Sequence, residues 1–197
     1  MYLTRREERI LDGSEGYARQ VAMKILVALG DLFGADRLIP IQWAHVAGVS
    51  YKNLGDASVE FLERLAGEGV KAQAFSTLNP CALDLERWGR MPLSRERYES
   101  QLRIIHLYSR MGIKPTLTCT PYYLAPVRRG AHLAWAESSA IAYANSVLGA
   151  RTNREGGPSA LASALIGRTP RYGYHLDENR RGDLLGKVQT PLKSVAD

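Results

Sequence analysis

Three short polar segments contain residue types that bind anions. In Gly48–Ser50, a glycine and a hydroxyl precede a predicted helix, where backbone N–H groups and an O–H can bind a negative charge. Asn79 follows a predicted strand and is held extended because a proline comes next. Arg151 and Arg154 lie in a glycine-rich loop, and guanidinium groups suit carboxylates and phosphates. An ordinary helix start, a turn and a solvated loop are the structural alternatives for these three segments.

Two further residues have side chains suited to catalysis or metal binding. Cys119 stands between Thr118 and Thr120, and Pro121 ends the predicted strand, so the thiol lies near a sheet edge. Thiolates are the usual ligands of iron–sulfur clusters, although a free cysteine is often simply buried. Glu137 begins a predicted helix. Its carboxylate either complements the helix dipole or binds and polarises a substrate group.

Composition limits the classes of function. The chain has 197 residues, enough for one domain or one and a half, and its net charge of +6 favours small anionic partners. The basic residues are scattered, so we expect no nucleic-acid partner. Cys81 and Cys119 are the two cysteines and form no CxxC motif, which argues against a structural disulfide or a complete four-thiolate site. Cys81 is best interpreted as a small apolar side chain that packs in the core.

Targeting features are lacking in the sequence. No apolar run reaches the eighteen or so residues of a membrane span, and the start from Met1 to Glu8 lacks the apolar core of a signal peptide. We therefore expect a cytoplasmic protein without a membrane partner.

The elements that position these residues alternate between helices and strands. Strands are predicted at 37–41, 70–77 and 115–120, with a possible one near 172–174, and 43–53 is predicted as a polar loop. Helices are predicted after Thr4, at 15–33, 57–66, 83–90 and 94–111, before 148–149, and at 159–166. This alternation predicts an α/β fold with a mainly parallel sheet flanked by helices. Ligands bind beyond the carboxyl ends of such strands, so loops 47–53, 77–81 and 119–122 should share one side.

Several longer motifs resemble the aconitase X family. The motifs are Ala44–Asp56, Thr77–Pro80, Thr118–Tyr122, Ala134–Ala140 and Gly149–Ser159. The match continues through Asp177–Arg180 and so covers nearly the whole chain, most closely with the phosphomevalonate branch of the family. The resemblance implies that residues 1–197 are a single, incomplete α/β domain, the front half of a large subunit with an aconitase-like catalytic fold. Residues 180–197 would be a loose end.

The resemblance also implies a cofactor and partners. Family members are iron–sulfur hydro-lyases, and by this likeness Cys119 is one of three ligands of a 4Fe-4S cluster. We expect the other two cysteines from a second-half segment that this sequence does not contain. A small subunit that resembles the swivelling domain of aconitase would complete the enzyme and supply the base, an activated serine.

The substrate implied by the resemblance is (R)-5-phosphomevalonate. Its dehydration gives trans-anhydromevalonate 5-phosphate in an archaeal mevalonate pathway. Seven residues match positions expected to contact substrate, namely Gly48, Val49, Ser50, Asn79, Pro80, Glu137 and Ser138. Glu137 would also protonate the departing hydroxyl. The alternatives are a cis-3-hydroxyproline dehydratase of the same family and a non-catalytic half-protein that binds a partner.

Overall fold

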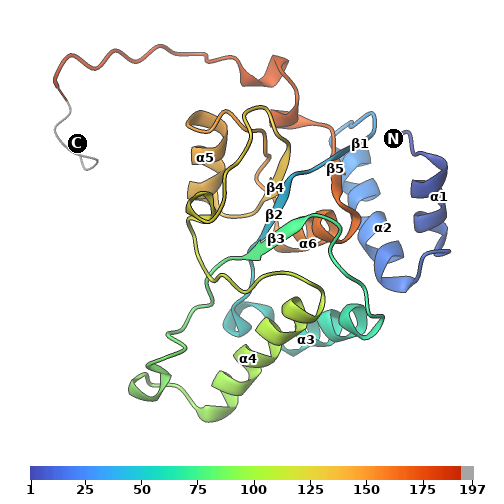
Figure 1. The fold of residues 1–197 in the computed structure, drawn as a ribbon, viewed down its shortest axis with the longest axis vertical. Helices are drawn as coiled ribbons and strands as arrows, with labels where there is room; N and C mark the ends of the chain where they lie inside the picture. The colour runs from blue at the N-terminus through green and yellow to red at the C-terminus, as the bar shows by residue number, and fades with distance from the viewer. Residues whose placement is uncertain (192–197) are drawn as a thin grey trace.

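A three-stranded parallel sheet forms the centre of the molecule (Figure 1). The computed structural model describes residues 1–191. The strand order is β3-β2-β4, with bounds Phe75–Leu78, Trp43–Val46 and Leu133–Trp135. His45 on β2 stands opposite Thr77 on β3 and Trp135 on β4. The predicted parallel sheet flanked by helices is therefore confirmed. A separate antiparallel pair joins β1 (Leu38–Pro40) to β5 (Arg168–Pro170).

Six α-helices lie within the described residues. They are α1 (Arg5–Asp12), α2 (Tyr17–Leu32), α3 (Tyr51–Gly67), α4 (Arg95–Arg110), α5 (Ser138–Ser146) and α6 (Gly157–Ile166). Side-chain caps fix two of the starts. Thr4 and Glu7 form a capping box at α1, and Ser94 accepts a hydrogen bond from the Arg97 N–H at α4. Both starts agree with the sequence prediction.

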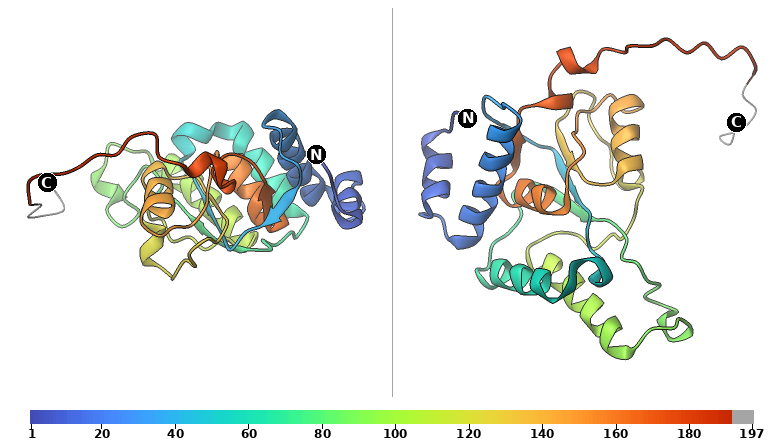
Figure 2. Two further views of the ribbon diagram at one scale, coloured as in Figure 1. Left: turned by 90° about the horizontal axis from the view of Figure 1, so that it is seen from above. Right: turned by 180° about the vertical axis from the view of Figure 1, so that it is seen from behind.

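The two faces of the parallel sheet pack against different helices. Small and aliphatic residues such as Ala44, Val46 and Leu78 pack with α2, α3, α4 and α6 in the larger core. On the other face, Trp43 and Trp135 pack with α5 in a smaller aromatic core. Side chains of a strand alternate between faces, so the aromatic residues and His45 share the α5 side. Figure 2 shows helices on both sides of the sheet.

Four secondary-structure predictions are wrong. Trp43–Val46 is the buried central strand rather than a polar loop, because a four-residue strand is too short to reveal a period. The segment 115–120 forms no strand: Lys114 alone bridges to β3, Pro115 has no N–H, and Leu117 has a φ of 48°. Residues 83–90 contain only the 3-10 turn Trp88–Arg90. Residues 173–175 form a 3-10 turn, and the strand lies earlier, at β5.

A histidine pair, His132 and the buried His175, lies at the amino end of β4. The Nδ1 atoms of His132 and His175 lie 3.0 Å apart, and His175 is 3% exposed. Arg151 donates to the His175 carbonyl, and Arg180 donates to the Ala150 carbonyl at 3.0 Å. These contacts tie residues 173–180 to the main body.

After the turn at Glu178–Arg180, residues 181–191 form no helix or strand and run away from the body (Figure 1). The remainder of the predicted loose end, residues 192–197, lies outside the described residues. Among the residues described, no helix has the length and apolar character needed to cross a membrane.

Candidate functional site

The carboxyl ends of β2, β3 and β4 bring three polar segments together. The Asn79 backbone N–H donates to the Val46 carbonyl at 2.9 Å, and the Ala136 N–H donates to the His45 carbonyl at 3.0 Å. The segments after β3 and β4 are therefore both held against β2. The Asn79 side chain then donates from Nδ2 to Oε2 of Glu137 at 2.6 Å. This contact joins residues 58 positions apart and crosses the end of the sheet. Two of the loops expected to share one side, 47–53 and 77–81, follow β2 and β3 here, whereas the third segment follows β4 and was not among those expected.

The backbone of Gly48–Ser50 is arranged to bind an anion. Gly48 has a φ of 74°, a left-handed conformation that favours glycine. The N–H groups of Gly48, Val49 and Ser50 donate to no acceptor within residues 1–191. Ser50 is the N-cap residue of α3, yet its hydroxyl makes no capping bond. Three N–H groups and a hydroxyl therefore remain available to a negatively charged group, whereas α3 is interrupted one turn later at Gly55, where φ is 64°.

The first residue of α6 packs closely against this loop. A Cβ at Gly157 would lie 2.6 Å from the Ala47 carbonyl oxygen, so only glycine permits the observed approach. Pro158 occupies the first turn of α6, as the sequence predicts.

Cys119 is exposed beside this end of the sheet. The Leu78 carbonyl, the last of β3, accepts hydrogen bonds from the Thr118 N–H at 3.3 Å and from the Thr116 hydroxyl at 3.1 Å. The Thr118 hydroxyl also accepts from the Thr120 N–H at 3.1 Å, which bends the backbone around Cys119. The alternative of a buried thiol at position 119 is therefore wrong. Cys81 is half-buried, and burial raises the pKa of its thiol.

A buried histidine under the site was missed by sequence reasoning. Thr77 Oγ1 accepts from the Trp43 indole at 2.8 Å, so its own hydrogen can be donated to His45 Nδ1, also 2.8 Å away. The hydroxyl has two lone pairs, so either tautomer of His45 satisfies this contact, and Nε2 has no hydrogen-bond partner among residues 1–191. Burial lowers the pKa of His45 to about 4, although the Thr118 backbone and Glu137 act in the opposite direction. His45 is therefore a neutral imidazole at physiological pH.

The other predicted residues are divided between this site and the opposite end of the sheet. Pro80 and Ser138 are exposed and directly follow Asn79 and Glu137. Glu137 is the N-cap of α5, a position where its charge complements the helix dipole, and its side chain makes no capping bond. Arg151 does not belong to this site, because it bridges to His132 before β4 and forms an ion pair with Asp177.

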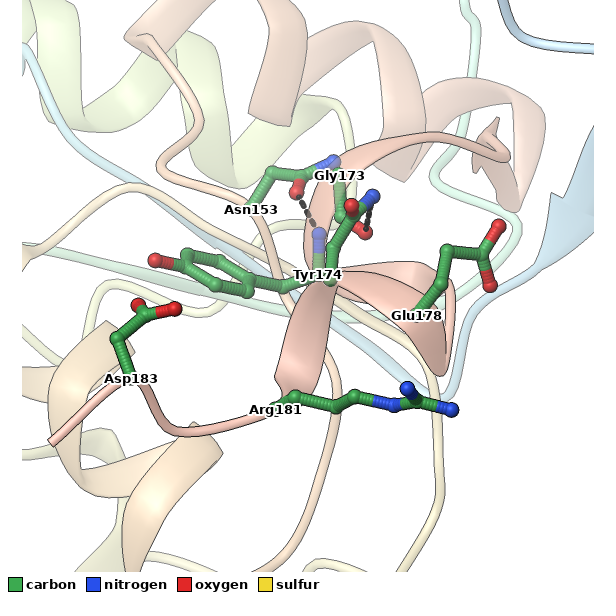
Figure 3. A pocket seen from close by; sticks show the side chains of 7 residues that line it. Asn153, Gly173, Tyr174, Glu178, Arg181 and Asp183 are labelled. Atoms are coloured by element: carbon green, nitrogen blue, oxygen red, sulfur yellow. Dashed lines mark hydrogen bonds between the residues drawn. The ribbon is translucent and has the colours of Figure 1, made fainter. Parts of the chain in front are cut away.

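Two hollows lie near candidate residues. One of about 330 Å³ adjoins Gly48–Ser50, hereafter the anion loop, and is lined by Ser50, Lys52, Gln101 and Arg97 among others. It therefore offers space and positive charge beside the loop. A more open hollow of about 600 Å³ lies at the 3-10 turns near Tyr174 (Figure 3). None of the predicted substrate-binding residues lines the second hollow.

Comparisons with known proteins identify the family. The family model described as the aconitase X first domain matches residues 1–178. The chain is 54% identical to the phosphomevalonate dehydratase large subunit of Thermococcus kodakarensis over 100% of this chain and 49% of that protein. It is 38% identical to the cis-3-hydroxy-L-proline dehydratase of Pseudomonas aeruginosa, over 97% of this chain and 33% of the other.

A solved structure gives the same result. The crystal structure of Thermococcus kodakaraensis aconitase X in its holo-form matches with a TM-score of 0.85 and 56% identity. The match covers 92% of this chain and 45% of that one, so the chain spans about half the length of these relatives. The chain therefore belongs to the aconitase X family and corresponds to its first domain.

Proposed function

We propose that this chain is the substrate-binding front half of an iron–sulfur hydro-lyase that converts (R)-5-phosphomevalonate to trans-anhydromevalonate 5-phosphate and water. The observation that carries the proposal is the Asn79–Glu137 hydrogen bond beside the open anion loop, in a chain 54% identical to a relative of that activity. The small-subunit swivelling domain and a second-half segment with two cysteines complete the enzyme. We assign the assembly to the cytoplasm and to the archaeal mevalonate pathway.

The anion loop binds one negatively charged group of the substrate. Gly48, Val49 and Ser50 contribute N–H donors, and the Ser50 hydroxyl adds a further donor. Phosphomevalonate carries a phosphate and a carboxylate, and either fits this arrangement. Lys52 and Arg97 line the adjoining hollow and increase the positive charge available to a phosphorylated substrate. A phosphate needs this charge more than an amino-acid substrate does.

Glu137 delivers a proton to the departing hydroxyl. Asn79 holds Oε2 of this carboxyl group at 2.6 Å, which fixes the side-chain rotamer. Oε1 has only a 3.4 Å contact with Ser139 and is the oxygen free to carry a proton. Asn79, Pro80 and Ser138 shape the surface around this oxygen. A positioned carboxylic acid of this kind contributes about 100- to 10,000-fold to the rate.

Cys119 fits a role as one cluster ligand. Its thiol is exposed and stands on a loop anchored to the end of β3. No group of three histidine, cysteine or acidic residues that could hold a metal occurs within residues 1–191. The residues present thus suit a shared site in which two thiolates come from the second-half segment. A 4Fe-4S cluster held in part by Cys119 would supply a Lewis acid for the leaving hydroxyl.

The test uses the complete enzyme, with the large subunit containing this chain and its small subunit. The dehydration of (R)-5-phosphomevalonate is measured as the rate of product formation. Cis-3-hydroxy-L-proline is tested in the same way as the alternative substrate. We expect turnover of phosphomevalonate alone. Turnover of hydroxyproline alone would support the alternative dehydratase, and an iron-free, inactive assembly would support the non-catalytic alternative.

Glu137→Gln tests the proton-transfer step. The amide keeps the size of the side chain and cannot release a proton, so kcat should fall at least about 100-fold while KM changes little. Ser139→Ala is the matched control, because its hydroxyl makes only the 3.4 Å contact with Glu137. Full turnover by Glu137→Gln would refute the assigned role.

A further inference from the structure

Gln101 is a buried polar residue on an otherwise apolar helix face. Its side chain is 1% exposed, and the neighbours that α4 buries are Ile104, Leu107 and Tyr108. A buried amide is unfavourable unless both its oxygen and its nitrogen are hydrogen-bonded. Burying an apolar side chain on this face would cost less free energy than burying a glutamine. The contacts of Gln101 therefore need to explain its presence.

Both polar atoms of Gln101 bind the backbone of the anion loop. Nε2 donates to the Val49 carbonyl at 2.8 Å, and Oε1 accepts from the Tyr51 N–H at 2.9 Å. Only one orientation of the amide satisfies a carbonyl and an N–H together, so the assignment of oxygen and nitrogen is fixed. The two bonds span Ser50, which lies between the bonded residues. One side chain therefore holds the backbone on both sides of the Ser50 hydroxyl.

These bonds satisfy backbone groups at the start of α3. The first N–H groups of a helix have no partner within the helix, and Gln101 accepts from Tyr51, the first residue of α3. A serine N-cap bonds the second or third helical N–H instead, and the Ser50 hydroxyl makes no such bond.

We propose that Gln101 is a positioning residue that clamps the anion loop in its binding conformation through the Val49 carbonyl and the Tyr51 N–H. The inference rests on the proposed function in that the loop binds the anionic group of the substrate. Gln101 acts on the site through its two hydrogen bonds to the loop backbone. Loss of these two hydrogen bonds weakens substrate binding by the loop. The residues that take part in the chemical step are unchanged.

The kinetic test is Gln101→Met in the complete enzyme. Methionine matches the length of glutamine and removes both hydrogen bonds. We expect KM for (R)-5-phosphomevalonate to rise about tenfold with kcat within about twofold, the pattern of lost ground-state binding. Ile104→Val is the control, since it perturbs the same buried face and removes no hydrogen bond. An unchanged KM in Gln101→Met, or an equal rise in Ile104→Val, would overturn the proposal.

A second measurement requires no substrate. Hydrogen exchange of the Tyr51 amide in the same assembly should be about tenfold faster in Gln101→Met, with exchange in β2 unchanged. Ile104→Val keeps both hydrogen bonds of Gln101 and should retain the slow exchange. Equal exchange in wild type and Gln101→Met would refute the clamp. If the wild-type enzyme does not dehydrate phosphomevalonate, the proposed function fails while this measurement still tests the clamp.

Discussion

Acidification should destabilise the fold through His175. Burial, followed by the charges of His132, Arg151 and Arg180, lowers the pKa of His175 to about 3 from an ordinary value of 6.5. The native state therefore keeps this imidazole neutral at pH values where the unfolded chain protonates it. The unfolded state binds the extra proton, so stability is present above pH 6.5 and is lost as the pH falls below it.

The size of the loss follows from the same pKa difference. At pH 5 the unfolded chain holds nearly one more proton at this position, which lowers the free energy of unfolding by about 2 kcal/mol relative to pH 7. Urea unfolding at both pH values measures the difference in wild type and in His175→Asn, whose amide does not titrate. We expect the loss in the variant to be smaller by about 2 kcal/mol.

A control separates this effect from general acid sensitivity. His106 lies exposed on α4, so His106→Asn should lose as much stability as wild type between the two pH values. If His175→Asn and wild type lose equal stability, the neutral buried state assigned to His175 is wrong.

Two further predictions concern the support of the site. Gly157→Ala places a Cβ 2.6 Å from the Ala47 carbonyl and should lower the free energy of unfolding by about 1–3 kcal/mol, whereas a Cβ at Gly156 meets nothing closer than 3.8 Å and Gly156→Ala should be tolerated. Equal thermal stability of the two variants would contradict this packing argument. Thr77→Val should cost about 1–3 kcal/mol, because it leaves two buried ring nitrogens, one of them on His45, without their partner. Thr77→Ser keeps the hydroxyl and should restore most of that loss in urea unfolding; failure to do so would assign the effect to packing alone.

Sequence patterns predicted the long helices and the class of the fold. Helices α2 and α4 have apolar residues at three- and four-residue steps, and Ser94 supplies a recognisable cap. The shortest strands gave no such pattern. Strand β4 has three residues and β2 has four, and His45 within β2 looks polar although it is fully buried. Its burial depends on the Thr77 hydroxyl, 32 positions away.

The candidate site, too, could be predicted from the sequence only in part. Motif resemblance selected Asn79 and Glu137 separately, but their hydrogen bond depends on the parallel register of β3, β2 and β4. Gln101 had no detectable pattern, since one glutamine in a charged amphipathic helix reads as a surface residue. Only tertiary packing places it against the anion loop.

The exposure of Cys119 has a practical consequence for handling the protein. An accessible thiol that no cluster protects is open to oxidation by air or peroxide, first to sulfenic acid and then to forms that cannot be restored. The half-buried Cys81, whose thiol contacts the Leu83 carbonyl, is less accessible to the same reagents. Preparations made without reductant or without exclusion of oxygen would therefore be modified at Cys119 before Cys81. The same difference makes position 119 the preferred point for attaching a spectroscopic label.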